Sequence, residues 1–432
     1  MRFAGRLETL QERQFRLLWA AQAVSAFGDG LFPIALAFAV VELTGSAGDL
    51  GIVFAAVLVP RAVLVLAGGV WADRLPRQRV MLAADLLRCA TEVAAAVVLV
   101  SQSAGIVTLV VLAALYGAGD AFFAPAITGL VPQTVPPSRL QQANALLGVT
   151  RSAAFLAGPA VAGVLVATAG PGWAFAGDAA TFAVSACFLA RIRVPRIARP
   201  PRARFTHELH AGWREVRSRR WVMIGIGFFA VWNLSIGPLF VLGPFVAARS
   251  LGGASSWGAI VTCAGVGSLI GAAVALRWRP RRPLATGFLL FGLCALEPAL
   301  LAKPFAVGVV AAAAALGFGA AACANAVWLT TLQERIPPGA ISRVSAYDWL
   351  GSIVFQPAGY VLVGPLVATL GTRSTLLLCA AAIAAASVGA ASLGAVRAVR
   401  RVEEDPMEET GFPRPQTRIS PEAAKAAGSY RR

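Results

Sequence analysis

Long apolar runs separated by short polar segments make up most of the 432-residue chain. The runs are about 20 residues long, enough for an α-helix to cross a hydrocarbon core about 30 Å thick. A transmembrane β-barrel would instead show shorter segments of alternating polarity, and the sequence has none. The pattern predicts twelve transmembrane helices, roughly at 16–41, 50–72, 80–101, 105–132, 144–169, 172–190, 222–247, 253–276, 284–302, 304–329, 344–369 and 373–396.

Composition agrees with this pattern. Hydrophobic residues make up 57% of the chain and charged residues 14%, against about 25% charged residues in soluble domains. The chain is therefore predicted to be an all-α polytopic membrane protein. The first apolar run is too long for the removable core of a signal peptide and is read as a retained helix. The six cysteines lie singly in apolar segments, so neither a metal site nor a disulfide is predicted.

Along the chain, connections that are rich in basic residues alternate with connections that have few of them. One set holds Arg74, Arg77, Arg79, Arg139, Arg277, Arg279, Arg281, Arg282, Arg335, Arg343 and the arginines of 191–220. The opposite set holds only Arg249, Lys303 and Arg373. The positive-inside rule then places both termini and the long middle connection in the cytoplasm. The net charge of +17 is a topology signal with an attraction to anionic lipid, and binding of nucleic acid is not expected.

The two halves of the sequence are related. "VPPSRLQQANAL" (135–146) resembles "IPPGAISRVSAY" (336–347), and "GVLVATAG" (163–170) resembles "GPLVATLG" (364–371), both at an offset of 201 residues. Such a repeat predicts two pseudo-symmetric six-helix bundles, the arrangement of many transporters. The expected domains are a bundle at 1–190, a cytoplasmic linker with an amphipathic helix at 191–221, a second bundle at 222–396 and a disordered cytoplasmic tail at 397–432.

The connection after the second predicted helix carries a recognisable motif, "GGVWADRLPRQR" (68–79). Its residues Gly69, Asp73, Arg74, Arg77 and Arg79 resemble the G-x-x-x-D-R-x-x-R-x-R signature of the major facilitator superfamily. One departure is a proline at position 76, where the family often has glycine. The resemblance extends over about residues 10–396 and implies the major facilitator fold. It also implies a gate in which the acid binds a neighbouring helix end; the alternative is a loop that collects arginine for topology alone.

A second motif lies on the fifth predicted helix. Gly158, Pro159 and Gly163 stand as in the G-x-x-x-G-P-x-x-G-G pattern of the antiporter branches, while Ala154 and Ala162 replace two glycines. The resemblance implies export, although membrane helices are rich in small residues in any case. Residues 15–32, 120–146 and 177–186 are similar to the branch of drug and siderophore exporters that includes macrolide-efflux and enterobactin-export proteins.

Ionisable residues within the predicted spans are candidates for function, because a charge in the membrane is costly. Asp29 and Arg61 lie at similar depths, roughly 20 Å and 17 Å from the inner surface at 1.5 Å per residue, and are predicted to form an ion pair. Glu92 has no obvious partner and is a second candidate for proton binding. Asp120 and Arg151 lie at middle to inner depths.

The resemblance also implies that helices 1, 4, 7 and 10 line a central cavity. This would place Asp29, Asp120, Asn233 and Asn325 there. For the two aspartates the alternative is a structural salt bridge that never titrates.

Four further charged residues lie within the predicted spans, away from the candidate proton sites. Asp85 and Arg88 are spaced for contact on one helix and are expected to form a structural pair near the inner surface. Asp178 and Glu297 lie nearer the outer ends of their helices, where we expect them to be hydrated.

These features together predict a secondary active transporter that exports a hydrophobic or amphipathic small molecule, such as a drug, siderophore or secondary metabolite, in exchange for protons by alternating access. The sequence has neither a Walker A motif nor a nucleophile–base arrangement, so the proton motive force is the expected energy source, with no enzymatic activity and no cofactor. The expected partners are the small molecule, protons and lipid, and the chain should act as a monomer in a bacterial inner (plasma) membrane. The alternatives are an uncoupled or lipid-handling facilitator of the same fold and a membrane sensor or assembly protein that transports nothing.

Overall fold

A computed structural model describes most of the chain. The described residues are 8–136, 139–193, 213–275, 277–278, 280–303, 305–336, 344, 347–348, 351 and 354–400. Within these ranges the side chains of residues 65–74, 124, 125, 129, 141 and 145 are outside the description. Much of the predicted linker and nearly all of the predicted tail therefore lie outside the described residues.

The first half of the chain folds into long helices joined by short turns. They are α1 (Arg13–Thr44), α2 (Ala47–Arg74), α3 (Arg77–Val100), α4 (Ile106–Leu130), α5 (Leu140–Ala169) and α6 (Pro171–Ala190), with short 3₁₀ turns η2 (Glu8–Gln11) and η3 (Val131–Gln133). Gly45 ends α1 in the left-handed conformation, with its N–H donating to the carbonyl of Val41. Pro171 is the first residue of α6, a position where the missing N–H of proline costs nothing.

The second half follows the same plan with more interruptions. Its elements are α8 (Arg220–Val246), the π-helical turn η5 (Ala247–Leu251), α9 (Ala254–Ala275), α10 (Pro283–Phe291), the 3₁₀ turn η6 (Gly292–Ala295), α11 (Leu296–Leu301), α12 (Val307–Arg335), α14 (Phe355–Ser392) and α15 (Gly394–Arg397). Together α10, η6 and α11 occupy the predicted ninth span, whose middle turn is 3₁₀ rather than α-helical.

The sequence repeat reappears in the backbone. α4 begins at Ile106 and α12 begins at Val307, the same offset of 201 residues. Gly170, between α5 and α6, has φ 87° and ψ 165°, and its counterpart Gly371, within α14, has φ 78° and ψ 163°. Residues with a side chain rarely adopt these backbone angles, so both positions favour glycine. Gly371 divides α14 at the point where the eleventh and twelfth predicted spans meet.

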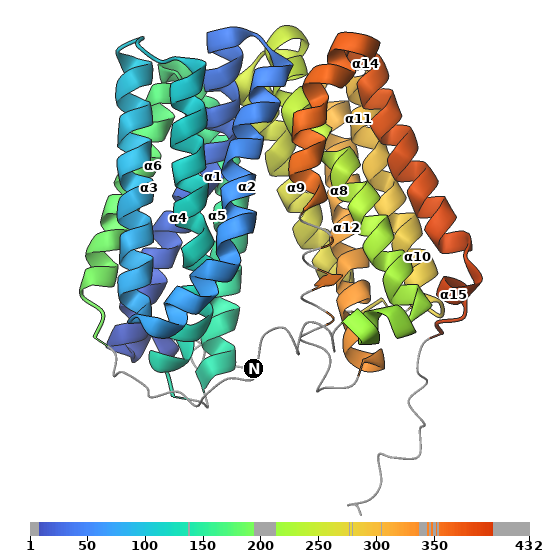
Figure 1. Cartoon of the computed structure of the whole chain (residues 1–432), viewed down its shortest axis with the longest axis horizontal. Helices are drawn as coiled ribbons and strands as arrows, with labels where there is room; N and C mark the ends of the chain where they lie inside the picture. Colours follow the sequence, from blue (N-terminus) through green and yellow to red (C-terminus); the bar gives the residue numbers. More distant parts are fainter. Residues whose placement is uncertain are drawn as a thin grey trace, which may run out of the picture.

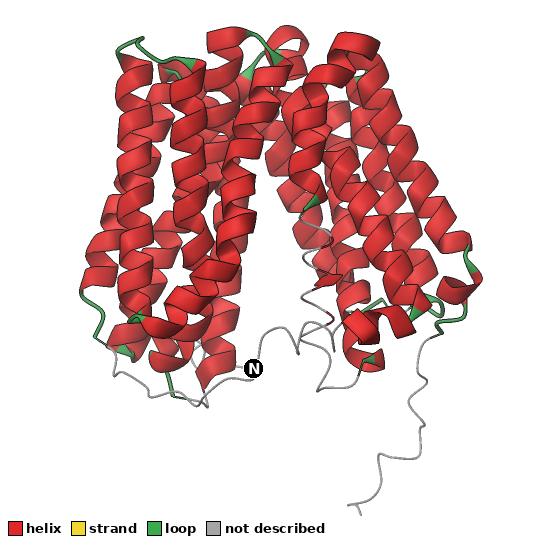
Figure 2. Ribbon diagram, viewed as in Figure 1, coloured by secondary structure: helices red, strands yellow, loops and turns green. Residues whose placement is uncertain are grey.

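The class of fold is confirmed, whereas the number of spans stays a prediction. Among the described residues there is no strand (Figure 2), and ten helices are long and apolar enough to cross a membrane. α3 is not among the ten, since Asp85, Arg88 and Glu92 lie in its middle. Counting α3 and dividing α14 at Gly371 would give the twelve spans expected from the sequence.

The two halves form two groups of helices that stand side by side (Figure 1). Their ribbons lie close together at one end and diverge towards the end at which α1 and α8 begin. The groups meet where α2 packs on α14 and where α5 packs on α9. A Cβ atom placed on Gly48 would lie 3.3 Å from Cα of Gly364, and one on Gly258 would lie 3.0 Å from Cα of Gly163. Small residues thus let the helices approach closely at both crossings.

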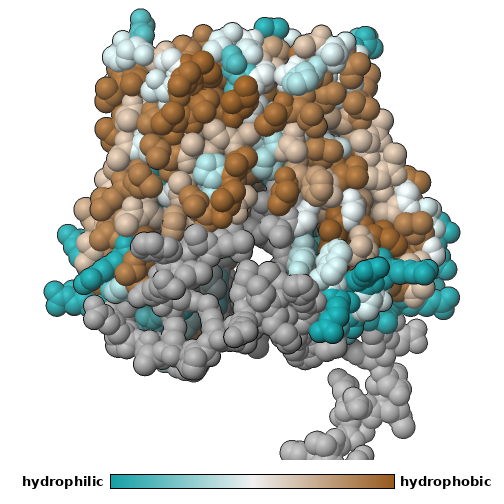
Figure 3. Space-filling view, in the orientation of Figure 1, coloured by the Kyte–Doolittle hydropathy of each residue, from teal (hydrophilic) through white to brown (hydrophobic). Residues whose placement is uncertain are grey.

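The outer surface is apolar over most of its height (Figure 3). Large apolar side chains such as Val63, Val107 and Val149 are exposed by 67%, 72% and 68%. Hydrophilic residues gather instead at the flanks of the end where the helix groups diverge (Figure 3). An apolar belt with polar ends is the surface expected of a protein that faces lipid.

Candidate functional site

Arg88 is the centre of the candidate site. It lies on α3 and is fully buried, the largest side chain buried to this degree among the described residues. Its guanidinium lies between two aromatic rings, 4.6 Å from the ring centre of Phe123 on α4 and 4.3 Å from that of Phe182 on α6. Aromatic faces stabilise a cation at this distance, more so away from water.

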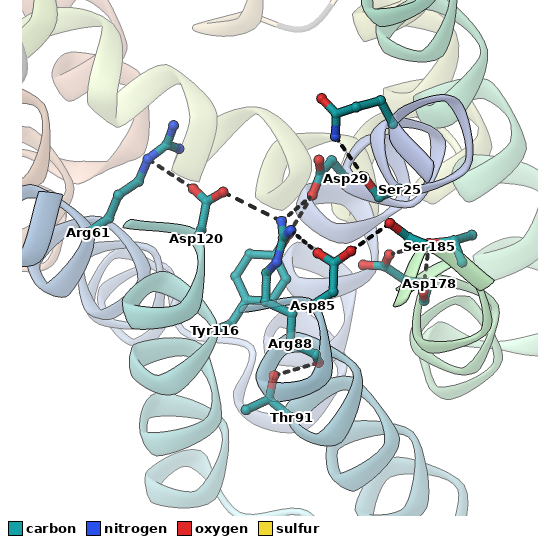
Figure 4. Close-up of polar contacts among 12 residues, drawn as sticks. Ser25, Asp29, Arg61, Asp85, Arg88, Thr91, Tyr116, Asp120, Asp178 and Ser185 are labelled. Atoms are coloured by element: carbon teal, nitrogen blue, oxygen red, sulfur yellow. Dashed lines mark hydrogen bonds and ion pairs between the residues drawn. The ribbon is translucent and has the colours of Figure 1, made fainter. Parts of the chain in front are cut away.

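Three carboxylates from three helices surround the Arg88 guanidinium (Figure 4). The nitrogen–oxygen distances are 2.5 Å to Asp85 on α3, 3.3 Å to Asp29 on α1 and 3.5 Å to Asp120 on α4. Nη1 of Arg88 faces both Asp29 and Asp120, so these two acids share one end of the guanidinium. Arg88 therefore holds α1, α3 and α4 together electrostatically.

Other polar side chains complete the surroundings of these acids (Figure 4). Arg61 on α2 contacts Asp120 at 2.9 Å, the Tyr116 hydroxyl donates to Asp29 at 3.1 Å, and the Ser185 hydroxyl donates to Asp85 at 2.6 Å. We call the set Asp29, Arg61, Asp85, Arg88, Tyr116, Asp120 and Ser185 the Arg88 network. The network reaches helices α1, α2, α3, α4 and α6.

The Arg88 network has more acids than bases. Three carboxylates face two guanidiniums, so one carboxylate is in excess when all are ionised. The side chains of Arg88 and Asp85 are 1% and 0% exposed, whereas that of Asp29 is 43% exposed. A buried excess charge is costly unless a proton or another cation neutralises it. The site can therefore take up one positive charge, and Asp29 is its most exposed acid.

The predicted ion pair between Asp29 and Arg61 is wrong. Arg61 contacts Asp120, and Asp29 contacts Arg88. The reason lies in helix packing, since α2 lies along α4 and touches α1 only slightly. Two residues at equal depth on consecutive helices need not be neighbours, because consecutive helices need not pack against each other.

The predicted pair of Asp85 and Arg88 is confirmed by a nitrogen–oxygen distance of 2.5 Å, while its structural role stays a prediction. Both are buried and form the core of the Arg88 network. A signal was present in the sequence, because Asp85, Arg88 and Glu92 are spaced by three and four residues and share one face of a helix. Three ionisable residues on one face of a membrane helix indicate a polar interior more strongly than any of them alone.

Two further acids lie deeper between α1, α3 and α6. Glu92 and Asp178 are 1% and 0% exposed, so the expected hydration of Asp178 is wrong. Each has one carboxylate oxygen without a hydrogen-bond partner among the described residues. Asp178 packs against the backbone of Gly28, and the Cys89 thiol donates to the carbonyl of Ala179 at 3.4 Å. A small cavity with room for about one water molecule adjoins Glu92.

The remaining predicted site residues do not join this network in the described structure. Asn233 donates to the carbonyl of Phe229 on its own helix, 2.9 Å away, while Asn325 and Arg151 are exposed. The expected hydration of Glu297 is wrong, because it is 4% exposed. Whether Asn233 and Asn325 line a cavity stays a prediction.

The two family motifs are placed only in part. Gly69, Asp73 and Arg74 lie on α2 with side chains outside the description, and Arg77 and Arg79 begin α3. The gating role of the first motif stays a prediction. In the second motif, a Cβ on Gly158 would lie 2.6 Å from Cα of Gly30 on α1, and one on Gly163 would lie 2.8 Å from the carbonyl of Ala254 on α9. The motif thus lies where α5 packs against α1 of its own bundle and against α9 of the other bundle.

Comparison with known proteins identifies the family. The chain is 27% identical over 383 residues to the "Multidrug efflux pump Tap" of Mycolicibacterium fortuitum, covering 84% of this chain and 90% of that protein. It is 26% identical over 231 residues to "Macrolide efflux protein A" of Streptococcus pyogenes, covering 53% and 55% of the two chains. The crystal structure of the nucleoside transporter NupG superposes with a TM-score of 0.71 at 13% identity, covering 87% of this chain and 98% of that chain. The family model "Major Facilitator Superfamily" matches residues 18–348, and the chain belongs to this superfamily of membrane transporters.

Proposed function

We propose that this transporter exports hydrophobic or amphipathic small molecules in exchange for protons. The observation that carries the proposal is the excess carboxylate of the Arg88 network. A membrane-buried group that gains and loses one positive charge is what proton coupling requires. Arg88 supplies a fixed countercharge that can be shared among Asp29, Asp85 and Asp120.

The geometry of the network supports a simple coupling step. Asp29 and Asp120 compete for the same nitrogen of Arg88, and Arg61 provides a second partner for Asp120. A proton on Asp29 neutralises that acid and leaves Arg88 to Asp85 and Asp120. Loss of the proton restores the attraction between α1 and α3. Protonation therefore changes the free energy of packing α1 against its neighbours, which biases one of two conformations.

Export rather than uptake is supported by the relatives and by α5. The two relatives are named as efflux proteins, and the Gly158–Gly163 segment follows the pattern of the antiporter branches. The arginine distribution supports a bacterial inner (plasma) membrane location with both termini in the cytoplasm. The end at which the helix groups diverge would then face the cytoplasm (Figure 1). The proposal needs no cofactor and treats the chain as a monomer.

Flux measurements in proteoliposomes test the proposal. The full chain is reconstituted, a pH gradient is imposed, and the movement of ethidium, an amphipathic dye, is followed by fluorescence. We expect dye movement against its gradient that stops when a protonophore is added. Dye movement that ignores the protonophore would indicate an uncoupled facilitator, and no movement beyond that in empty vesicles would indicate a protein that does not transport such molecules.

A further inference from the structure

Arg151 is a charged side chain of the N-terminal bundle that lies outside the Arg88 network. It is on α5, which begins at Leu140, and this places it roughly 17 Å along the helix axis at 1.5 Å per residue. The residue is exposed, and among the described residues no acid forms an ion pair with it. A guanidinium this far inside a membrane protein needs water or an anion beside it, because lipid does not solvate charge.

The burial of its residues gives α5 two exposed faces. One face is apolar and is formed by Ala153, Ala157 and Val164. The other face is formed by Asn144, Gly148, Arg151 and Phe155, which follow one another at intervals of four, three and four residues. We call these four residues the Arg151 stripe. At 3.6 residues per turn the two faces point in roughly opposite directions, so the apolar face can meet lipid while the stripe faces away from it.

The Arg151 stripe lies between the two helices on which α5 packs. On one side, a Cβ on Gly158 would lie 2.6 Å from Cα of Gly30 on α1. On the other side, a Cβ on Gly163 would lie 2.8 Å from a carbonyl oxygen of α9. Phe155 itself reaches α9, because a Cβ on Gly265 would lie 3.5 Å from its ring. The stripe therefore faces the other bundle.

The space beside the stripe is open. Gly148 lies one turn before Arg151, and no described atom lies within 4 Å of a Cβ placed on it. Both residues belong to the first half of α5, which starts at the end where the two helix groups diverge (Figure 1). Phe155, one turn after Arg151, contacts α9. Arg151 is thus exposed towards the space between the bundles, next to the point where they meet.

The chemistry of the stripe favours an anion with an apolar part. Arg88 holds three carboxylates and Arg61 contacts Asp120 at 2.9 Å, so these two cations are already neutralised. Arg151 has no such partner, and its planar guanidinium can donate two parallel hydrogen bonds to an oxyanion such as a carboxylate or phosphate. Phe155 is 55% exposed about 6 Å further along the axis and offers an apolar surface.

We propose that the Arg151 stripe binds the oxyanion of an amphipathic anion, whose apolar part lies against Phe155. The inference rests on the proposed export function and adds acidic amphipathic molecules to the cargo. Asn144, on the same face nearer the start of α5, offers an amide to a second polar group of a longer molecule. Closing the diverging end would bury Arg151, and a bound oxyanion lowers the cost of that burial. The anion therefore favours the closed state.

Equilibrium dialysis with the full chain in lipid nanodiscs tests the site, with empty nanodiscs to correct for partition into lipid. The probes are 1-pyrenebutyrate, an aromatic carboxylate, and 1-pyrenebutanamide, a neutral molecule of nearly the same shape. We expect Arg151→Gln to weaken binding of the anion by at least about tenfold and binding of the neutral probe by no more than about twofold. Arg373→Gln is the matched control, because it removes an exposed arginine of α14, and it should leave both affinities unchanged.

A second pair of variants leaves Arg151 in place. Gly148→Glu adds an acid three residues before Arg151, in open space, where it can pair with the guanidinium and compete with the probe. Gly148→Gln adds a side chain of the same size without charge. We expect the glutamate variant to bind the anion at least about tenfold more weakly than the glutamine variant.

Several outcomes would overturn the inference. An equal loss for both probes in Arg151→Gln would show that Arg151 only shapes the space, and an unchanged affinity for the anion would show that it does not bind charge. If Arg151→Gln does not fold, equal binding of the anion by the two Gly148 variants has the same meaning. Wild-type protein that transports ethidium but binds both pyrene probes equally would refute the inference alone. Wild-type protein that moves neither ethidium nor 1-pyrenebutyrate would refute the proposed export function as well.

Discussion

The two bundles share a backbone plan but differ in their interiors. At the offset of 201 residues, the positions that match Asp29, Arg88 and Asp120 are occupied by Ala230, Leu289 and Ala321. The N-terminal bundle thus has a network of ion pairs where the C-terminal bundle has apolar side chains. The described interior of the C-terminal bundle instead has Glu297, which is 4% exposed and has no ion pair with a described arginine or lysine.

This difference predicts that proton coupling depends on the N-terminal bundle. Ion pairs that can be rearranged by one proton suit coupling, because the same bundle holds both signs of charge. The positions of the C-terminal bundle that match Asp29, Arg88 and Asp120 carry no charge, so the same rearrangement cannot take place there. Duplication of the fold supplies two similar bundles, and the residues inside each then determine what it binds.

The largest difference should appear when Arg88 is removed. Arg88→Ala leaves Asp85 buried without a cation, and breaking a buried pair in this way costs about 3–5 kcal/mol. We expect a large drop in thermal stability and in yield of the purified protein, measured in detergent. Leu289→Ala, at the matching position of the other bundle, is the control and should have little effect because Leu289 is 51% exposed. Equal stability of the two variants would contradict the central role of Arg88.

The two helix crossings between the bundles should respond alike to added side-chain volume, although the interiors of the bundles differ. Gly163 and its counterpart Gly364 both lie at helix crossings between the bundles. Gly163→Ala would place a Cβ 2.8 Å from the carbonyl of Ala254, and such overpacking costs about 1–3 kcal/mol. Gly364→Ala should have the same sign and a smaller size, since its Cβ would lie 3.2 Å from the nearest atom, Cα of Gly48.

The labelling of single cysteines, placed at the end where the two helix groups converge, measures how tightly the helix crossings are held. Both variants should raise cysteine labelling there, because the crossings are held less tightly. Gly148→Ala lies on the same helix as Gly163 with nothing within 4 Å of its Cβ, and it should leave labelling unchanged. Identical labelling of Gly163→Ala and Gly148→Ala would show that the crossings do not hold this end closed.

Coupling should depend on Asp29 and not on its counterpart. Asp29→Asn removes the exposed acid of the Arg88 network and with it the excess carboxylate. We expect gradient-driven dye transport to fall by at least about tenfold, equivalent to about 1.4 kcal/mol, while downhill exchange persists. Ala230→Asn places the same side chain at the matching position of the other bundle and should retain proton coupling. A stable Asp29→Asn variant with full gradient-driven transport would show that proton coupling depends on Asp120 or Glu92 instead.

The sequence predicted the fold well and the site only in part. Spacing of apolar residues located the helices, and the repeat anticipated the paired glycines Gly170 and Gly371. Pattern alone could not pair Arg61 with Asp120, because helix packing decides which charges meet. The burial of Glu297 also could not be predicted from the sequence. It depends on how α11 packs inside the bundle, and the apolar pattern around Pro298 does not show which face of that helix is buried.

The smallest effect is expected at the edge of the Arg88 network. Arg61→Gln removes the partner that contacts Asp120 at 2.9 Å, but the Arg61 side chain is 45% exposed and Asp120 keeps its contact with Arg88 at 3.5 Å. Solvent-exposed ion pairs contribute about 1 kcal/mol or less. Thermal stability should therefore change little, and the N-terminal bundle should remain folded. Transport should still respond, because Asp120 then competes more strongly with Asp29 for Arg88, so the proton concentration that gives half-maximal export should shift. A pH profile of dye export measures this shift. An unchanged profile would confine the coupling site to Arg88 and its three acids, whereas a loss of stability as large as that of Arg88→Ala would make Arg61 part of the structural core.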